Sequence, residues 1–286
     1  MDKDTIKRLI IEYQQFVANI TLIEREIHLS HQLNYVFVGL RRAGKSYLMY
    51  QQIQSLLNDG HQPEEILYFN FEDDRLVNLT VEDLDLIKVS YEELYPHKPI
   101  FFLDEIQIVE HWEKFARRLA DQQYRVYITG SNAKMLSAEI ATTLGGRYIV
   151  QNVYPFSFSE FLKASKIEIG PTWYYKNRTE IVRTFSDYFS YGGLPELMLI
   201  ETIEKRQWLS NLFNKIFFGD LITRYSIRND LAMKVLIRKL AESVKQPSSF
   251  NRLTNIVSTT GAKVSTDTII DYLNFLQATW LFFSLE

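Results

Sequence analysis

One stretch of the chain has the residue types and the spacing of a phosphate-binding loop, the Walker A pattern G-x-x-x-x-G-K-[ST]. Its glycines allow backbone angles and a close approach that a Cβ atom would block. The N–H groups of such a loop can turn inward and cradle a polyphosphate in front of a helix N-terminus. The lysine is expected to bind the outer phosphates, and the serine hydroxyl is expected to bind Mg²⁺. The residues are Gly39, Leu40, Arg41, Arg42, Ala43, Gly44, Lys45 and Ser46.

A loop of this kind needs a buried strand before it and a helix after it. Residues 35–38 are apolar, aromatic or β-branched, which predicts the strand. After Lys45, apolar side chains at Leu48, Ile53 and Leu56 follow a helical spacing, and residues 58–60 (Asn-Asp-Gly) are expected to end the helix. This context favours a phosphate loop over a glycine turn with an incidental lysine.

A second group of chemically capable residues follows an apolar run at residues 100–103. Asp104 and Glu105 come directly after this predicted strand, as in the Walker B pattern. Asp104 is expected to hold Mg²⁺ through water, because this ion keeps much of its hydration shell. Glu105 is expected to orient and polarise an attacking water. The alternative is an exposed acidic pair at a strand end.

Three more apolar segments complete a predicted five-stranded sheet, at residues 65–71, 125–128 and 148–150. Their alternation with helices predicts an α/β fold with parallel strands, which bind ligands at their carboxyl ends. Ser131 or Asn132 follows the fourth strand and could sense the terminal phosphate from there. A plain helix N-cap is the competing interpretation of these two residues.

Arg147 precedes the fifth predicted strand. It is a candidate arginine finger, a group that raises turnover by about 10³–10⁵ in related reactions. Acting on another copy of the chain would require a homo-oligomer. An ordinary surface arginine is the alternative.

Several weaker candidates surround the loop. Arg25 and Ile27 lie shortly before the first strand and could border a base, although core packing also accounts for Ile27. Glu72 follows the second strand and could reach a metal ion or a water, although a surface loop is favoured there. Arg41 and Arg42 either contact phosphate oxygens or are solvated.

The remainder of the chain reads as mainly helical. Ser157 and Glu160 form a capping box at the start of residues 157–200, which are predicted to fold as a small helical lid. Pro195 lies in a Gly-x-Pro turn near the end of this segment. Residues 248–286 resemble a winged-helix unit, with a helix beginning at Ser265. The predicted domains are residues 1–153, 154–200 and 201–286.

Composition narrows the class of protein. The 286 residues are 46% hydrophobic and 23% charged, as in a soluble globular protein, and they include no cysteine. The absence of cysteine excludes disulfides and thiolate chemistry and fits a reducing, cytoplasmic environment. No apolar run approaches 18 residues, so no membrane span is expected. The sequence stops inside an apolar run at 280–285, which indicates either a piece of a longer protein or an unusually short one.

Charge is uneven along the chain. The net charge is −3 overall, but residues 201–286 carry 11 basic and 8 acidic side chains. This part could contact DNA or an acidic protein, although a solvated basic face is the simpler interpretation. A helix beginning at Ser265 carries Asp267 and Asp271 and no basic residue, which disfavours it as a DNA-reading helix.

Taken together, the segments GLRRAGKS, FFLDEIQ, YITGSN, LGGR, YPFSFSEFL and YGGLPE resemble the bacterial and archaeal AAA+-type P-loop ATPases that have a C-terminal helical, winged-helix-bearing region of unknown function. The resemblance runs from about residue 15 to the end. It implies AAA+-type strand order and ATP with Mg²⁺ as ligands. It also implies that residues 39–47, which end at Tyr47, bind the nucleotide and that Pro195 contacts the adenine. Members often continue into a nuclease-like domain, but no such role follows for this chain.

The resulting hypothesis is a Mg²⁺-dependent ATPase that hydrolyses ATP slowly and uses the nucleotide to set the position of its lid. A small-molecule phosphotransferase is disfavoured, because the Asp104–Glu105 pair suits water activation, which a kinase does not need. A DNA-binding regulator that holds ATP with little turnover is the non-enzymatic alternative.

Overall fold

The computed structural model describes residues 2–76, 79–130, 142–167, 170–244, 246–261 and 264–283. The chain divides into two compact units, Met1–Glu201 and Thr202–Glu286. The three-domain division expected from the sequence stays a prediction. Among the described residues, none of the helices has the length and apolarity that a membrane crossing requires.

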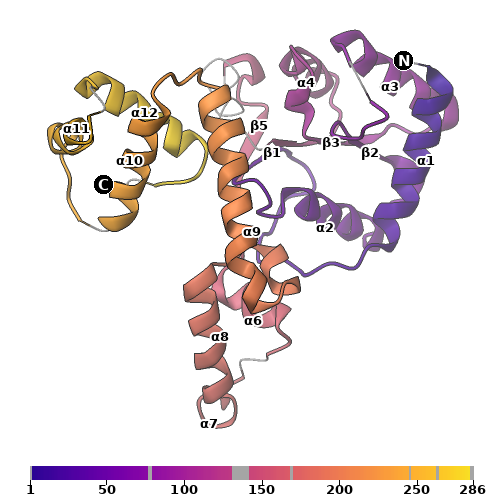
Figure 1. Cartoon of the computed structure of the whole chain (residues 1–286). Helices are drawn as coiled ribbons and strands as arrows, with labels where there is room; N and C mark the ends of the chain where they lie inside the picture. Colours follow the sequence, from indigo (N-terminus) through magenta and orange to yellow (C-terminus); the bar gives the residue numbers. More distant parts are fainter. Residues whose placement is uncertain are drawn as a thin grey trace. The chain divides into compact units, whose positions relative to one another are not determined.

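The first unit is built on a five-stranded parallel sheet (Figure 1). Its strands lie in the order β2-β3-β4-β1-β5, so that β4 separates the strand before the phosphate loop from the strand that ends in Asp104. This confirms the predicted parallel sheet and its strand order. The strands are β1 (Asn34–Val38), β2 (Ile66–Asn70), β3 (Ile100–Asp104), β4 (Val126–Gly130) and β5 (Tyr148–Asn152).

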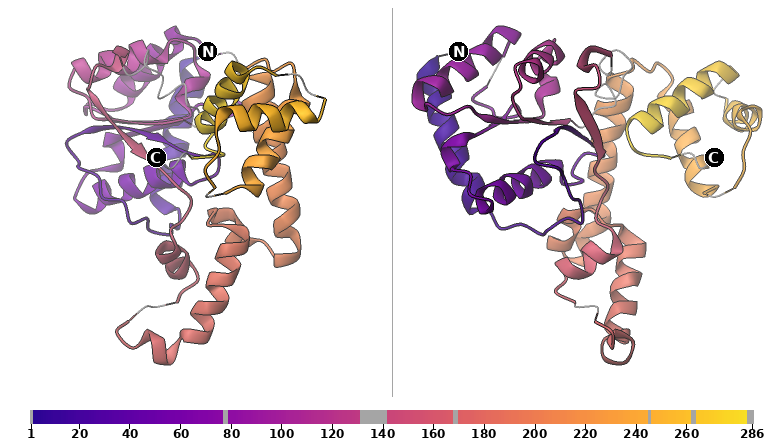
Figure 2. Two further views of the ribbon diagram at one scale, coloured as in Figure 1. Left: turned by 90° about the vertical axis from the view of Figure 1, so that its left-hand side faces the viewer. Right: turned by 180° about the vertical axis from the view of Figure 1, so that it is seen from behind.

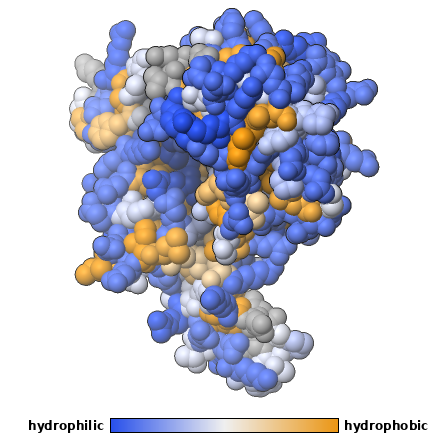
Figure 3. Space-filling view, turned by 90° about the vertical axis from the view of Figure 1, so that its right-hand side faces the viewer, coloured by the Kyte–Doolittle hydropathy of each residue, from blue (hydrophilic) through white to orange (hydrophobic). Residues whose placement is uncertain are grey.

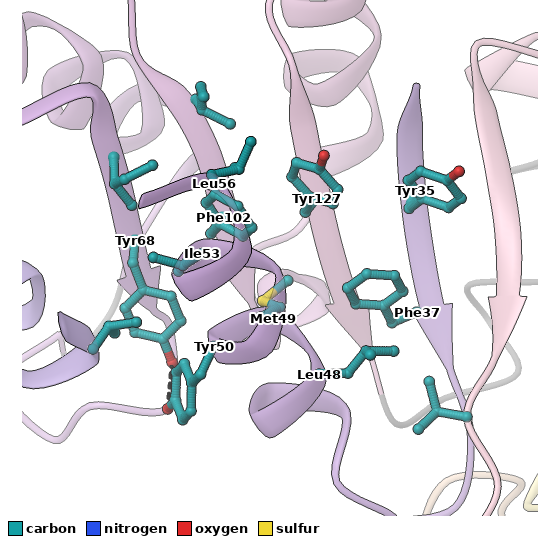
Figure 4. Close-up of a cluster of buried hydrophobic side chains, with 14 residues drawn as sticks. Tyr35, Phe37, Leu48, Met49, Tyr50, Ile53, Leu56, Tyr68, Phe102 and Tyr127 are labelled. Atoms are coloured by element: carbon teal, nitrogen blue, oxygen red, sulfur yellow. Dashed lines mark hydrogen bonds between the residues drawn. The ribbon is translucent and has the colours of Figure 1, made fainter. Parts of the chain in front are cut away.

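Helices cover both faces of this sheet (Figures 1 and 2). Helix α2 packs on one face, where Phe37, Tyr68, Phe102 and Tyr127 form a buried aromatic layer beneath Met49 and its neighbours (Figure 4). Helices α3 and α4 lie over the other face, and α1 runs beside β2. Burial on both faces accounts for the nearly continuous apolar strands. The helices are α1 (Lys3–Asn19), α2 (Lys45–Asn58), α3 (Val81–Leu94) and α4 (Trp112–Asp121), with short 3₁₀ turns η1 (Pro63–Glu65) and η2 (Ile106–Ile108).

Helix α1 buries the apolar side chains that recur at helical spacing along one of its faces. Asp2 caps its first turn through a 2.9 Å bond from the Thr5 amide, and Ile6, Leu9 and Ile10 are fully buried against the sheet side. Its exposed face carries the charged Arg8 and Glu12 together with the apolar Ile11 and Phe16. Figure 3 looks onto this side of the first unit and shows a mostly hydrophilic surface with small, separate apolar patches.

A helical segment follows β5 within the first unit. The predicted capping box at Ser157 and Glu160 is confirmed: the Ser157 side chain accepts a hydrogen bond from the Glu160 amide, and the Glu160 carboxylate accepts one from the Ser157 amide. The segment is not one continuous helical run, because turns divide it. Its elements are α6 (Phe158–Ala164), α7 (Trp173–Lys176), α8 (Arg178–Tyr191) and the 3₁₀ turn η4 (Pro195–Leu199).

The second unit is helical and has its own core. Leu236, Leu253, Val257 and Leu276 are among the residues buried there, and the rings of Tyr225 and Phe275 stack with centroids 3.9 Å apart. Over residues 202–244, 246–261 and 264–283 the structure contains no strand, so the wing of a winged helix stays a prediction. The elements are α9 (Thr202–Lys215), the π-helical η5 (Ile216–Thr223), α10 (Asp230–Glu242), α11 (Phe250–Thr259) and α12 (Thr266–Ala278).

Candidate functional site

The phosphate-loop sequence folds as a turn between β1 and α2, closed by a 3.1 Å hydrogen bond from the Ala43 amide to the Leu40 carbonyl. Arg42 and Gly44 adopt left-handed backbone angles, with φ of 66° and 96°. Left-handed residues that alternate with right-handed ones turn their N–H groups toward one concave point, which is an anion-binding geometry. A Cβ on Gly39 would overlap the carbonyl of Val153, so this glycine is required by the close approach of the chain after β5.

Lys45 begins α2 and points back into the loop. Its side chain is only 4% exposed, and its ammonium donates to the carbonyls of Gly39 (3.2 Å) and Leu40 (3.1 Å). A Glu105 carboxylate oxygen lies 4.0 Å from the same nitrogen. Burial lowers the pKa of Lys45, and the Glu105 and Asp104 carboxylates offset part of that decrease. The Lys45 ammonium is therefore shielded from water, and the nearby carboxylates compensate its positive charge only in part.

Asp104 ends β3 and is 2% exposed. The Tyr68 hydroxyl donates to one of its carboxylate oxygens at 2.7 Å, and the Thr129 hydroxyl donates to the other. The Ser46 side chain of the loop lies near enough to this carboxylate to lower its pKa as a hydrogen-bonding group. Burial raises the pKa of Asp104, against these hydrogen bonds, which lower it. The carboxylate is thus held in a fixed orientation beside the loop serine.

Glu105 is held in an unusual backbone conformation next to Asp104. Its φ is 55°, a left-handed angle that is costly for a side chain with a Cβ, and its amide donates to the Thr129 hydroxyl at 2.9 Å. The Gln107 side-chain amide donates to its carboxylate. Thr129 therefore orders both acids: its hydroxyl donates to Asp104 and accepts from Glu105.

These residues meet at the carboxyl edge of the sheet and match the ligand preferences of a magnesium–phosphate group. Ser46 and Asp104 supply hard oxygen donors side by side, and Lys45 and the loop amides supply donors for phosphate oxygens. No cluster of three or more His, Asp or Glu that could hold a metal occurs among the described residues. Two protein oxygens suit Mg²⁺, which takes its remaining ligands from water and phosphate.

The other loop residues make contacts with their surroundings. Arg41 lies 3.5 Å from the Glu72 carboxylate, and Arg42 pairs with Glu196 after the Gly-x-Pro turn. Tyr47 is 52% exposed, and its ring centroid is 5.5 Å from that of Tyr50. From the sequence, Glu72 is a candidate to contact a metal ion or a water. In the structure its carboxylate forms an ion pair with Arg41.

The predicted base-edge residues line one cavity of about 840 Å³. Arg25 and Ile27 contribute to its wall together with Phe156, Tyr188 and Gly193. Pro195 borders the loop itself, since its Cγ would lie 3.8 Å from a Cβ placed on Gly44. The structure therefore brings Arg25 and Pro195 next to the phosphate loop, while Ile27 lines the neighbouring cavity.

Arg147 does not join this group. It precedes Tyr148, which pairs with Asn34 at the amino ends of β5 and β1, and it forms an ion pair with Asp121. Because the strands are parallel, Arg147 lies at the edge of the sheet opposite the loop and cannot act on the site of its own chain. Ser131 and Asn132 lie outside the described residues.

Three contributors were missed by sequence reasoning: Tyr68, Thr129 and Gln107. Thr129 had a usable signal, because it is a polar residue near the end of an otherwise apolar strand. Tyr68 had none, since its contact with Asp104 depends on how β2 and β3 pair. Gln107 lies two residues beyond Glu105 in a short 3₁₀ turn that the sequence did not predict.

Two family models and several known proteins match the sequence of this chain. A family model described as an AAA domain matches residues 31–162, and one described as a domain of unknown function (DUF8612) matches residues 182–286. An uncharacterized protein of Methanocaldococcus jannaschii is 32% identical over 288 residues, which is 99% of this chain and 64% of that protein. An uncharacterized protein of Haemophilus influenzae is 32% identical over 277 residues, 93% of this chain and 67% of that protein.

Solved structures resemble the chain only loosely. AMPPCP-bound DnaA from Aquifex aeolicus is 14% identical with a TM-score of 0.35, over 95% of this chain and 87% of that one. Cdc6p from Pyrobaculum aerophilum is 14% identical with a TM-score of 0.34, over 96% of this chain and 84% of that one. At TM-scores this low, neither similarity supports an inference about function.

Proposed function

Because the chain belongs to the family of AAA-domain P-loop ATPases whose C-terminal part is a domain of unknown function, we propose that it binds Mg²⁺ and ATP and hydrolyses the nucleotide slowly to ADP and phosphate. The relatives are longer than this chain, so the proposal concerns the chain alone.

One observation carries the proposal. A buried ammonium at Lys45 and a buried carboxylate at Asp104 lie at the same edge of the sheet, with Glu105 4.0 Å from the ammonium and Ser46 near the carboxylate. Burial disfavours the charged form of both groups. A triphosphate would supply negative charge to the ammonium, and its divalent cation would supply positive charge to the carboxylate. A magnesium nucleotide is therefore the ligand that compensates both.

The roles of the residues follow from their positions. Lys45 and the loop amides bind the outer phosphates, and Ser46 and Asp104 hold Mg²⁺, which withdraws charge from the transferring phosphoryl group when bound. Glu105 accepts a hydrogen bond from the attacking water and orients it for in-line displacement of ADP. Thr129 and Gln107 keep Glu105 aligned. Ser131 and Asn132 remain proposed sensors of the terminal phosphate.

The nucleotide is also proposed to set the position of the helical segment that follows β5. The loop contacts this segment directly, since Arg42 pairs with Glu196 and Pro195 borders Gly44. We place the base near Pro195 and the cavity lined by Arg25 and Ile27. A ligand can shift the segment only by binding its two positions with different affinity, and a loop that carries contacts to the segment provides that difference.

ATP binding and turnover by the wild type, Lys45→Ala and Glu105→Gln test the assignment. We expect Lys45→Ala to lose ATP affinity, and we expect Glu105→Gln to bind ATP and to turn it over far more slowly. ATP affinity that is the same in wild type and Lys45→Ala would refute the binding site. Unchanged turnover in Glu105→Gln would refute the assigned water-orienting residue.

Two further proposals concern partners and place of action. Arg147 can complete a site only in a neighbouring copy, so its proposed finger role requires a homo-oligomer, which mass measurement in solution with and without ATP tests. Use of ATP and Mg²⁺ favours action in the cytoplasm.

The DNA-binding alternative gains no support from α10, where Lys234 and Arg238 pair with acids one turn away. A flat anisotropy titration with DNA at low salt would exclude it.

A further inference from the structure

Arg25 joins three segments that are far apart in the sequence. Its guanidinium is 5% exposed and donates to the Glu160 carboxylate (2.8 Å), the Ala43 carbonyl (3.0 Å) and the Tyr154 carbonyl (2.7 Å). These acceptors belong to α6, to the phosphate loop and to the chain after β5. One planar cation therefore ties the loop to the helical segment.

The contact with the loop has a direct consequence for phosphate binding. The Ala43 carbonyl and the Gly44 N–H belong to the same planar peptide and point in opposite directions. By holding the carbonyl, Arg25 fixes the direction of the Gly44 N–H, one of the loop amides. A charge-assisted hydrogen bond to the carbonyl also polarises the peptide and strengthens its N–H as a donor.

The contact with α6 is equally constrained. Glu160 accepts from Arg25 and from the backbone amides of Glu26 and Ser157, each of these two at 2.8 Å. The same carboxylate therefore caps α6 and neutralises Arg25. Any displacement of the guanidinium acts on the first turn of α6, because the capping bonds share its counter-ion.

The link continues beyond α6. The ring of Phe156 lies against the guanidinium, with its centroid 5.0 Å from the central carbon. The Phe156 amide donates to the Gly193 carbonyl at 2.7 Å, and the Tyr188 hydroxyl donates to the Phe156 carbonyl at 2.9 Å. The residues that touch Arg25 are thus bonded to α8 and to the Gly-x-Pro turn.

We propose that Arg25 is a positioning residue for the nucleotide, which orients the Gly44 amide and transmits the state of the phosphate loop to α6 through Glu160. This inference rests on the proposed function, because the nucleotide supplies the change at the loop. Stability alone accounts poorly for the pair, since a buried ion pair seldom stabilises a fold more than apolar residues of the same volume.

Hydrogen–deuterium exchange with and without Mg²⁺ and ATP tests this proposal, together with ATP affinity and thermal stability. The variants are Arg25→Lys, which keeps the charge but cannot span three acceptors, and Glu160→Gln, which keeps the Arg25–Ala43 bond. Arg118→Met, which removes an exposed pair with Asp85, is the control.

In the wild type, ATP is expected to slow exchange both in the loop (residues 39–46) and in α6. Arg25→Lys is expected to weaken ATP binding roughly tenfold and to abolish the response of α6 while the loop remains protected. Glu160→Gln is expected to keep ATP affinity within about threefold, because the loop contact persists, and to reduce the response of α6. Arg118→Met should behave as the wild type.

Other results would overturn the inference. If α6 responds normally in Arg25→Lys, or does not respond in the wild type while the loop does, Arg25 does not transmit the state of the loop. If ATP affinity falls in both variants in proportion to their thermal stability, Arg25 is only structural. If ATP does not protect the wild-type loop at all, the proposed function fails and this inference fails with it.

Discussion

Two sets of charged residues, one in each unit, differ in burial and pairing: Lys45 and Asp104 in the first unit, and Lys234 and Arg238 in the second. In the first unit, Lys45 and Asp104 are almost completely buried, and their partners come from other strands and loops. In the second, Lys234 and Arg238 form i,i+4 pairs with acids on their own exposed helix face. In such a pair each charge has its partner one turn away on the same helix, and each pair stabilises the helix by a few tenths of a kcal/mol.

This difference indicates where a ligand is needed. Burial lowers the pKa of Lys45 and raises that of Asp104, so the folded chain holds both groups against their preference for water. The Lys234–Asp230 and Arg238–Glu242 pairs on α10 are about half exposed or more, so water solvates their charges and they need no ligand. Clusters of buried charged groups with shifted pKa values are typical of functional sites, although structural pairs also produce them.

The largest effect is expected at Glu105. Glu105→Gln should lower kcat by about 10²–10⁴ while ATP affinity stays within a few-fold, because the amide keeps the shape but is a poor acceptor for the proton of water. Steady-state phosphate release and nucleotide titration measure the two quantities. Glu110→Gln, an exposed acid nearby, is the control. If both variants lose activity equally, the carboxylate of Glu105 has no specific role in the reaction.

At Lys45 we expect a loss of ATP binding without a loss of stability. Lys45→Met should weaken ATP binding about tenfold to hundredfold, the value of a charge-assisted hydrogen bond. It should not lower the melting temperature of the nucleotide-free protein, because it removes a buried cation whose pKa burial has already lowered. Thermal melts without nucleotide check this. A clear loss of stability would mean that Lys45 is a structural residue.

A smaller and pH-dependent effect is expected at Glu160. Burial alone would raise its pKa, but the hydrogen bonds from Arg25 and from the Ser157 and Glu26 amides bring it below the ordinary 4.5. The depressed pKa adds stability that is present above pH 4.5 and is lost as the pH falls through the folded value. Glu160→Gln should therefore cost about 1–3 kcal/mol at pH 7.

Chemical denaturation from pH 7 to pH 3 checks the prediction at Glu160. The wild type should lose more stability on acidification than Glu160→Gln, so the two curves should converge in acid. Parallel curves would show that the carboxylate of Glu160 contributes nothing specific. This comparison separates the buried pair from the exposed pairs of the second unit.

The smallest effect is expected in the second unit. Arg238 is well exposed, and its pair with Glu242 is 3.0 Å long. Arg238→Ala should change the free energy of unfolding by no more than about 0.5 kcal/mol and leave ATP affinity unchanged. A large loss of ATP affinity would mean that the second unit takes part in the site and that the contrast between the units is wrong.

Much of the fold could be predicted because the signals were local. The strand before the loop was expected at residues 35–38 and is found at Asn34–Val38, and the Ser157–Glu160 capping box was read directly from residue spacing. Apolar periodicity and caps depend on neighbours in the sequence. The juxtaposition of Lys45 with Glu105 was also predicted, because parallel strands present their carboxyl ends at one edge.

What could not be predicted depends on tertiary pairing. Arg25 and Glu160 are 135 residues apart, and no sequence motif contains both of them. The hydroxyl of Tyr68 reaches Asp104 only because β2 pairs with β3 in a register that sets Asn70 opposite Asp104. Arg147 was assigned a role from its place before a strand, and only the register of β5 with β1 shows that it lies at the far edge.

The central claim is that one magnesium nucleotide compensates two buried charges. Its most direct test is the melting temperature of the wild type and of Asp104→Asn with ATP alone, with Mg²⁺ alone and with both. At 100 times Kd, ligand binding adds about 2.7 kcal/mol of stability. We predict a rise of several degrees in the wild type that needs both ligands and is greatly reduced in Asp104→Asn. No rise, or an equal rise in Asp104→Asn, would contradict the account.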